Sequence, residues 1–283
     1  MKKLNTPKKI LAFLLKWTFL IFMLLFTIYP VTYAFLGSFK TNMEVVRGTS
    51  FLPESWQLDN YITAFTRGNF DRYTFNSVAI SVMVTIFALI MASMAGYVFA
   101  RMDFYGKKLL HRLYMSFMFI SLGSVTLYPI YALFTTVGLA KTLLGMALVI
   151  TGAQVSNIFL VQGFIRSVPR ELDEAAYIDG CNPFQVYAIM ILPVIRPVLA
   201  VVGLFSFRGA WNNYITPQVM SIGATHLRTL TVAVVSLRDA ANAATEWHIM
   251  LAGASIALLP MLLVYAATNR QFISGLTAGA VKG

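Results

Sequence analysis

Residues 167–197 read SVPRELDEAAYIDGCNPFQVYAIMILPVIRP and form the longest polar interruption in the second half of a very apolar sequence. Pro169 suits the first position of a helix, where its missing N–H is not needed and its fixed φ favours helical backbone. Glu171, Asp173 and Glu174 follow in the first turn, where the helix dipole favours negative charge. This part of the stretch therefore predicts a short helix with a defined start.

A second short helix is predicted to begin as soon as the first one ends. Gly180 stands where a left-handed residue would end the first helix. Asn182 followed by Pro183 is typical of the cap and first residue of the next helix. Pro193 and Pro197 then mark the return to an apolar segment. Residues 167–197, called the knuckle below, are therefore predicted to form a compact helix–turn–helix. A solvated loop between two membrane spans is the alternative, and it leaves the paired caps unexplained.

The composition is that of a membrane protein. Of the 283 residues 58% are hydrophobic and 12% charged, and the mean hydropathy is +0.71, whereas soluble proteins carry about 25% charged residues. The net charge of +11 would suggest nucleic acid as partner of a soluble chain. Here the basic residues cluster beside apolar segments. The positive-inside rule and attraction to anionic lipid explain that placement, so no nucleic-acid partner is expected. One cysteine and three scattered histidines predict neither a disulfide framework nor a metal site.

Six apolar segments are each about as long as the roughly 20 residues that a membrane-spanning helix needs. They divide the chain into a cytoplasmic N-terminal segment (1–16), a six-helix transmembrane domain (17–268) and a cytoplasmic C-terminal tail (269–283). The first segment has the basic start of a signal peptide, but it is longer than the usual apolar core of about 7–15 residues, so a span is predicted. An external loop with a short amphipathic helix near residues 58–65 is expected after it. The predicted spans are residues 17–37, 75–100, 113–137, 142–163, 198–220 and 249–268.

The basic residues predict the side of the membrane on which each loop lies. With the N-terminus inside, 7 of the 22 Lys and Arg residues fall outside, Arg208 falls within a span, and the other 14 fall inside. This excess places both termini and the knuckle in the cytoplasm. The outside residues are Lys40, Arg47, Arg67, Arg72, Lys141, Arg228 and Arg238.

Two absences in the sequence bear on the energy source. No G-x-x-x-x-G-K-[ST] phosphate loop occurs, so the chain has no recognisable means of binding ATP for itself. The predicted spans contain essentially no Asp or Glu, which a proton- or sodium-coupled carrier would usually need near the midplane. An external source of energy is therefore favoured over secondary transport.

The predicted fifth span is unusually polar near its outer end. Trp211, Asn212, Asn213 and Tyr214 place two amides between two aromatic rings. Amides can hydrogen-bond hydroxyl groups while rings cover an apolar ring face, so these residues are candidates for the path of a sugar. An aromatic belt at the outer membrane interface explains the same pattern, and depth cannot be read from the sequence.

Other polar residues within the predicted spans carry the same ambiguity. Gln154 and Asn157 in the fourth span are further candidates for the substrate path, with hydrogen bonding between helices as the alternative. Arg208 either lines the path or pairs with a partner subunit, because a charge within a span normally faces a cavity or a partner.

The knuckle also carries a resemblance. Glu174-Ala175-Ala176, with Gly180 four residues on and Ile191-Leu192-Pro193 beyond it, resembles the EAA loop of ATP-binding-cassette (ABC) importer permeases. In that family the loop docks into a cleft on the cytoplasmic ATPase. The resemblance implies an ATPase-coupling role for a set of knuckle residues, namely Glu174, Ala175, Ala176, Asp179, Gly180 and Pro193.

Further segments resemble the carbohydrate-uptake permeases of the maltose-permease-like (MalG) type, and this resemblance runs from about the first span to the last residue. They are Asn76-Ser77, residues 95–101 with their small residues, residues 129–139, Trp211-Asn212, and the tail QFISGLTAGAVKG at 271–283. In that type the tail reaches into the ATPase dimer interface, which implies contacts for Gly275, Gly279 and Lys282. A frayed terminus is the alternative for the tail.

The resemblance implies an all-α, six-span permease subunit of an ATP-driven importer in a bacterial cell membrane, with a di- or oligosaccharide as substrate. It implies as partners a second permease subunit in a heterodimer, two cytoplasmic ATPase subunits carrying ATP and Mg²⁺, an extracytoplasmic solute-binding protein, and membrane lipid. The chain itself is expected to be no enzyme and to bind no cofactor. An importer permease for a non-sugar solute and a secondary carrier are the alternatives.

Overall fold

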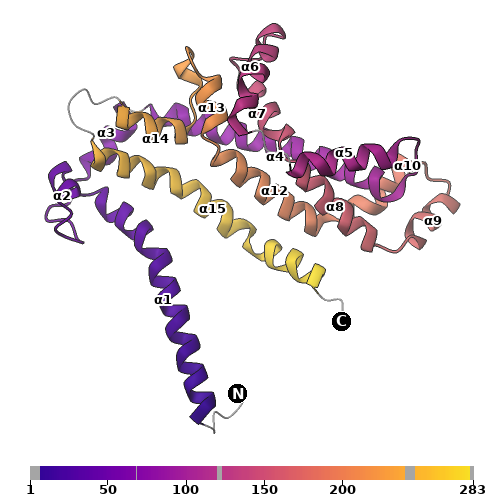
Figure 1. The fold of residues 1–283 in the computed structure, drawn as a ribbon, viewed down its shortest axis with the longest axis horizontal. Helices are drawn as coiled ribbons and strands as arrows, with labels where there is room; N and C mark the ends of the chain where they lie inside the picture. The colour runs from indigo at the N-terminus through magenta and orange to yellow at the C-terminus, as the bar shows by residue number, and fades with distance from the viewer. Residues whose placement is uncertain (1–6, 68, 120–122, 240–245, 281–283) are drawn as a thin grey trace. The chain divides into compact units, whose positions relative to one another are not determined.

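The computed structural model describes residues 7–67, 69–119, 123–239 and 246–280, and all of its regular elements there are helices (Figure 1). The all-α prediction is therefore confirmed for the described residues. The chain divides into two compact units, which are described separately below. Unit 1 comprises Met1–Phe70 and Val234–Ile256, and unit 2 comprises Asp71–Ala233 and Ala257–Gly283.

Unit 1 begins with the long helix α1 (Pro7–Gly37), whose apolar side chains from Leu11 onward are largely exposed. A helix that is apolar all round and uncovered by its own chain suits a lipid environment. The short helix α2 (Asn42–Arg47) starts at a capping box between Thr41 and Glu44. Helix α3 (Asp59–Arg67) confirms the amphipathic helix predicted near residues 58–65.

The connection between α1 and α3 is held by side-chain bonds to backbone. The Asn60 amide donates to the carbonyls of Ser38 at 2.8 Å and Lys40 at 2.9 Å. The buried Lys40 ammonium donates in turn to the Ser50 carbonyl. Phe70 closes this unit against Gly253, where an added Cβ would lie 2.7 Å from the Phe70 ring.

Unit 2 carries most of the helices, and α14 and α15 contribute residues to both units. Helix α4 (Phe70–Arg101) is the longest continuous apolar element of this unit. The other helices are α5 (Lys107–Phe119), α6 (Leu127–Thr136), α7 (Leu143–Gly152), α8 (Val155–Ser167), α9 (Glu171–Ile178), α10 (Pro183–Gln185), α11 (Leu192–Val194), α12 (Arg196–Trp211), α13 (Ile215–Met220), α14 (Leu230–Asp239) and α15 (Trp247–Ala280). Short 3₁₀ turns are η1 (Gly123–Thr126) and η3 (Thr225–Leu227), and η2 (Val186–Ile191) is a π-helix.

The main core of unit 2 joins the end of α4 to α8, the knuckle and α12. Gly96 lets α4 approach α8 closely, because a Cβ there would lie 2.9 Å from Val161 Cγ1 and 3.1 Å from the Gln162 backbone nitrogen. Val161 and Val202 are fully buried in this core. The small residue at position 96 thus allows the close packing of α4 against α8.

The start of α4 is tied to the segment before α14 by two polar side chains. The Asn76 amide donates to the carbonyls of His226 and Arg228, both at 2.9 Å. The Ser77 hydroxyl accepts from the Leu230 N–H at 2.8 Å. The Asn76-Ser77 pair thus satisfies backbone groups of a loop about 150 residues away, which gives this pair a structural role.

Three of the described helices are long and apolar enough to cross a membrane, and the number rises to five if each of two bent pairs is one span. The predicted fourth span is bent by 56° between α7 and α8. The segment that comprises α10 and α11 is bent by 80° relative to α12, which follows it. The continuous helix predicted over 198–220 is wrong, because α12 ends at Trp211 and α13 starts at Ile215. Six spans stay a prediction.

Two further boundaries differ from the sequence predictions. The predicted third span falls on α5, η1 and α6, with Pro129 in the first turn of α6, where it leaves the helical bonds intact. Helix α15 runs without a break from Trp247 to Ala280, so the predicted division between span and tail at residue 269 falls within a helix and stays a prediction.

Candidate functional site

The first knuckle helix is α9. Its first turn carries Glu171, Asp173 and Glu174, as predicted, but Pro169 lies two residues before the helix and Arg170 is the N-cap. The prediction that Pro169 is the first helical residue is wrong by two positions, a common shift because helix ends are set by local bonding as well as by sequence. Here the Arg170 carbonyl already accepts from the Asp173 and Glu174 N–H groups.

The turn after α9 is made by Gly180, whose φ of +84° confirms the predicted left-handed residue. Asp179 is the C-cap, the Gly180 N–H donates to the Tyr177 carbonyl, and the Cys181 N–H donates to the Ala176 carbonyl. This pattern satisfies the carbonyls at the helix end and directs the chain away at once.

The second knuckle helix starts at a reciprocal cap, confirming Asn182 as the N-cap. The Asn182 side chain accepts from the Gln185 N–H at 2.9 Å, and the Gln185 side chain accepts from the Asn182 N–H at 2.8 Å. The helix then widens into the π-helical η2 before α11, which contains Pro193. Because Pro193 has no N–H to donate, the preceding turn cannot complete an ordinary α-helical ladder.

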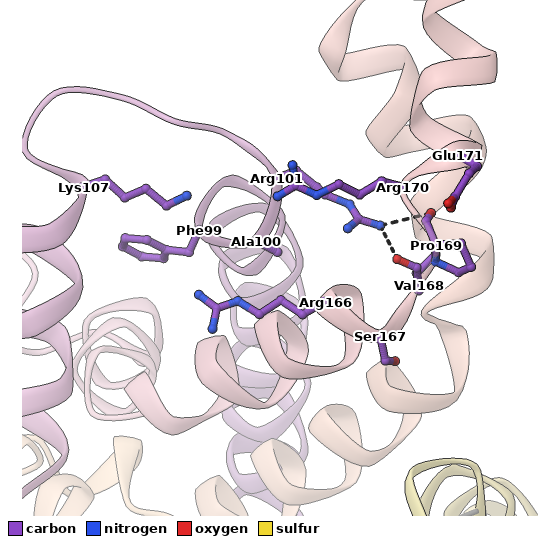
Figure 2. Close-up of a pocket in the computed structure, with 10 residues that line it drawn as sticks. All are labelled: Phe99, Ala100, Arg101, Lys107, Arg166, Ser167, Val168, Pro169, Arg170 and Glu171. Atoms are coloured by element: carbon purple, nitrogen blue, oxygen red, sulfur yellow. Dashed lines mark hydrogen bonds between the residues drawn. The ribbon is translucent and has the colours of Figure 1, made fainter. Parts of the chain in front are cut away.

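Apolar residues and one ion pair fix the inner side of the knuckle to unit 2. Ala176, Val186 and Ile191 are buried in the core that includes α4 and α8. Arg101, the last residue of α4, places its Nε 2.7 Å from Asp173 Oδ2, and these side chains are only 7% and 10% exposed. Arg101 also donates to the Val168 carbonyl at 2.8 Å (Figure 2).

Burial dominates the electrostatics of this ion pair. Desolvation raises the pKa of the Asp173 carboxyl above its ordinary value, and the Arg101 guanidinium opposes that rise. Asp173 Oδ2 lies within ion-pair distance of Arg101 Nε, and neither carboxylate oxygen has an aligned hydrogen bond. Sequence reasoning placed Asp173 in the first turn of a helix and missed this contact, because its partner is 72 positions away in the chain.

The outer side of the knuckle is apolar and uncovered by this chain. Ile178 is 87% exposed, Phe184 is 65% exposed, and Tyr177, directly before Ile178, is half-exposed. The predicted coupling residues Glu174, Ala175 and Asp179 are exposed on the same helix, whereas Ala176 faces the core. A folded element that is anchored inside and apolar outside is suited to seat in a hollow of another protein.

The predicted tail contacts are only partly described. Gly275 and Gly279 lie in the last turns of α15. Lys282 lies outside the described residues.

The polar residues of the bent fourth segment bond to one another. Gln154 precedes α8, and its Oε1 accepts from Asn157 Nδ2 at 2.7 Å and from the Ser206 hydroxyl of α12 at 2.6 Å. Asn157 Nδ2 also donates to Ser206 Oγ at 3.1 Å. The structure therefore brings Gln154 and Asn157 together with Ser206. These bonds join α8 to α12, as expected if the two residues serve hydrogen bonding between helices.

The four candidates at the end of α12 differ from one another. Trp211 is 3% exposed and donates through Nε1 to the Ala257 carbonyl at 3.2 Å, so it packs inside the unit. Asn213 Oδ1 accepts from the Thr216 N–H at 3.1 Å and caps α13. Asn212 is exposed and Tyr214 half-buried, in the gap between α12 and α13. Asn212 and Tyr214 keep their whole polar groups available to a solute, and Asn213 keeps its Nδ2 donor.

An exposed stripe continues from Asn212 along α12. Phe205, Arg208 and Gly209 are exposed at helical spacing from Asn212, while the opposite face of the helix is buried. This stripe places a charge and an amide on one face of an otherwise apolar element.

Comparison with known proteins identifies the family. A family described as "Binding-protein-dependent transport system inner membrane component" matches residues 62–273. The chain belongs to this family. It is therefore a membrane protein of the ABC transporter permeases, in which the ATPase is a separate subunit.

Individual permeases match over nearly the whole chain. The putative ABC transporter permease protein ORF2 of Caldicellulosiruptor sp. is 34% identical over 278 residues, covering 95% of this permease and 97% of the relative. The probable starch degradation products transport system permease AmyC of Thermoanaerobacterium thermosulfurigenes is 31% identical over 288 residues and covers 100% of both. The trehalose transport system permease SugB of Mycobacterium tuberculosis is 31% identical over 261 residues, covering 91% and 93%.

Solved structures show the same permease fold. A chain of a bacterial ABC transporter involved in the import of the acidic polysaccharide alginate superposes with a TM-score of 0.75 at 20% identity, covering 96% of this permease and 100% of that chain. A chain of the MetNI methionine ABC transporter gives a TM-score of 0.54 at 16% identity, covering 73% and 95%. At these identities the likeness concerns the fold alone.

Proposed function

We propose that this permease forms half of the translocation path of an ATP-driven importer for a di- or oligosaccharide and takes its energy from a separate ATPase. The observation that carries the proposal is the knuckle, which is anchored to α4 by the Arg101–Asp173 pair and presents the exposed Ile178 and Phe184 outward. Related permeases are named for the transport of starch degradation products, arabinooligosaccharides and trehalose, all of them carbohydrates.

The route of energy follows from these contacts. ATP and Mg²⁺ would be held by the ATPase subunits, whose closure moves the docked α9. The buried Arg101–Asp173 pair and the bond between the Tyr187 and Ser93 hydroxyls, at 2.8 Å, would carry that movement into α4. The knuckle continues through α11 into α12, so the same movement reaches the second bent pair. Rocking of packed helices around a fixed site is the usual form of alternating access.

Three features of the proposal come from the family resemblance and the charge pattern. A second permease subunit would cover the exposed stripe of α12 and complete a heterodimer, with Arg208 facing that subunit. The knuckle and both termini would lie in the cytoplasm, where Gly275, Gly279 and Lys282 would approach the ATPase dimer. A solute-binding protein would deliver the sugar on the outer side.

The sugar path is proposed to pass the helix break at residues 212–214. Interrupted helices are common at transporter binding sites, because unwound backbone within the membrane needs a cavity or protein around it. Asn212 would hydrogen-bond sugar hydroxyls and Tyr214 would cover a sugar face. Gln154 and Asn157 would hold α8 against α12 beside this break.

Reconstitution tests the function directly. Proteoliposomes holding the permease heterodimer and its ATPase should accumulate labelled maltodextrins only when ATP is enclosed with the ATPase and the solute-binding protein is supplied outside. Uptake driven by a proton or sodium gradient without ATP would identify a secondary carrier. ATP-dependent uptake of peptides with no response to oligosaccharides would assign a non-sugar cargo.

Replacing Asn212 by alanine is expected to raise the KM for uptake about fivefold, since one neutral hydrogen bond contributes about 1 kcal/mol. The melting temperature should stay unchanged because Asn212 is exposed at the helix end and its side chain makes no hydrogen bond to the described residues. Trp211→Phe is the matched control. It removes the bond to the Ala257 carbonyl, so it should lower the melting temperature and leave KM near the wild-type value. An unchanged KM in Asn212→Ala would remove this residue from the path.

A further inference from the structure

A basic pocket lies at the start of the knuckle. Its volume is about 640 Å³, and it is formed where α4 and α8 end and α5 and α9 begin (Figure 2). Its charged lining consists of Arg101, Lys107, Arg166, Arg170 and Glu171. Four cations around one acid make this a site for an anion.

The four cations are not equally available. Arg101 is engaged by Asp173, and Lys107 donates to the Met102 carbonyl at 2.6 Å and to Asp103 at 2.9 Å. This hydrogen bond from Lys107 lowers the pKa of the exposed Asp103 carboxyl. Arg166 and Arg170 are exposed and make no ion pair among the described residues.

The side chains converge on the pocket from different helices. Figure 2 shows the Lys107 ammonium entering from the start of α5 and the Arg166 guanidinium from the end of α8, with Phe99 between their backbones. An anion placed there would satisfy Arg166 and Arg170 without breaking the Arg101–Asp173 pair. It would also join α5 and α8 to the residue that precedes α9.

The surroundings of the pocket are those expected at the level of lipid headgroups. Arg101 ends the apolar helix α4, and Arg166 is next to the last residue of α8. Along α5, Leu109, Leu113 and Phe117 recur at helical spacing and are 59%, 47% and 62% exposed. The exposed cations Lys108 and Arg112 lie in the first half of the helix, and the side chains beyond Arg112 are mainly apolar. Such a helix offers an uncovered apolar surface directly beside the cations, which suits acyl chains below a charged headgroup.

We propose that the basic pocket binds the phosphodiester headgroup of an anionic phospholipid, with the acyl chains along the exposed side of α5. Inorganic phosphate offers the same anionic chemistry, but it leaves that apolar surface uncovered. The lipid would act as a bridge between α5, α8 and the start of the knuckle. This proposal concerns lipid and stands apart from the identity of the transported solute.

Native mass spectrometry of the purified permease–ATPase complex tests the proposal. The complex is titrated with phosphatidylglycerol and, separately, with phosphatidylcholine of the same chain lengths. Wild type should retain phosphatidylglycerol preferentially, and Arg166→Gln should weaken that retention about fivefold, the effect of one surface cation on anionic lipid. Arg166→Lys should keep most of it, since it keeps the charge.

Arg196→Gln is the matched control, because Arg196 is exposed on the same predicted side of the membrane and does not line the pocket. Equal retention by Arg166→Gln and Arg196→Gln would overturn the assignment. So would displacement of phosphatidylglycerol by millimolar inorganic phosphate, which would indicate a site for the free ion. Loss of ATPase subunits from Arg166→Gln with unchanged lipid retention would assign the pocket to the ATPase instead.

Discussion

Replacing Asp173 by alanine is expected to abolish uptake and to lower the stability of the permease. Its carboxylate is the counter-charge of Arg101, and the two side chains are 10% and 7% exposed. Removing one member of a buried ion pair leaves the other charge uncompensated, which costs about 3–5 kcal/mol. The basic pocket lets water reach the Arg101 side, so we expect a loss near the lower end of this range. Because the pair joins α9 to α4, the knuckle should lose its anchor first.

A double-mutant cycle separates the ion pair from the two side chains. Thermal unfolding is measured for Asp173→Ala, Arg101→Ala and the double variant. The free energy of unfolding lost in the double variant should be smaller than the sum of the losses in the two single variants. The raised pKa of Asp173 shows that desolvation outweighs the attraction of Arg101. Apolar replacement of both, as Arg101→Met with Asp173→Leu, should therefore recover most of the stability.

Glu171→Ala is the control for this prediction. Glu171 is an exposed acid in the same first turn of α9 and makes no ion pair among the described residues. Its removal should change the free energy of unfolding by no more than about 0.5 kcal/mol. If Asp173→Ala unfolds and transports like Glu171→Ala, the pair is not the anchor of the knuckle.

Local chemistry explains which parts of the knuckle could be predicted from the sequence. Gly180 and Asn182 act on backbone groups within a few residues, so their positions in the chain suffice to assign the turn and the cap. The anchor was missed for the opposite reason, because Asp173 depends on Arg101 at the end of a distant helix. The π-helical η2 was also missed, since apolar periodicity does not distinguish a wide turn from an ordinary one.

The transport path shows where composition stops being informative. The predicted spans over 142–163 and 198–220 are apolar over most of their length, and the breaks within them carry small or amide residues that a continuous helix also tolerates. The polar pattern from Trp211 to Tyr214 falls on the break between α12 and α13, and its role in the path stays a prediction. It could not show that Trp211 faces inward while Asn213 caps α13, because those roles depend on the direction of each side chain after the break.

Replacing Gly180 by leucine is expected to reduce uptake about 5- to 30-fold while the protein stays in the membrane. At φ +84° any residue with a Cβ is strained, and the left-handed conformation costs about 1–2 kcal/mol for such residues. A change of that size shifts the population of the turn by a factor of about 5–30. An added Cβ would meet nothing within 4 Å, so the strain lies in the backbone alone. Relief of this strain would change the angle between α9 and α10.

Two matched variants make this prediction specific to the knuckle. Gly138→Leu imposes the same strain at φ +73°, also with nothing within 4 Å of the added Cβ, in the turn before α7. It should lower the melting temperature similarly and leave ATP-driven uptake near the wild-type rate. Gly180→Asn should restore part of the uptake, because asparagine tolerates left-handed backbone better than leucine does. Wild-type uptake by Gly180→Leu in proteoliposomes would show that the geometry of this turn does not couple the ATPase to transport.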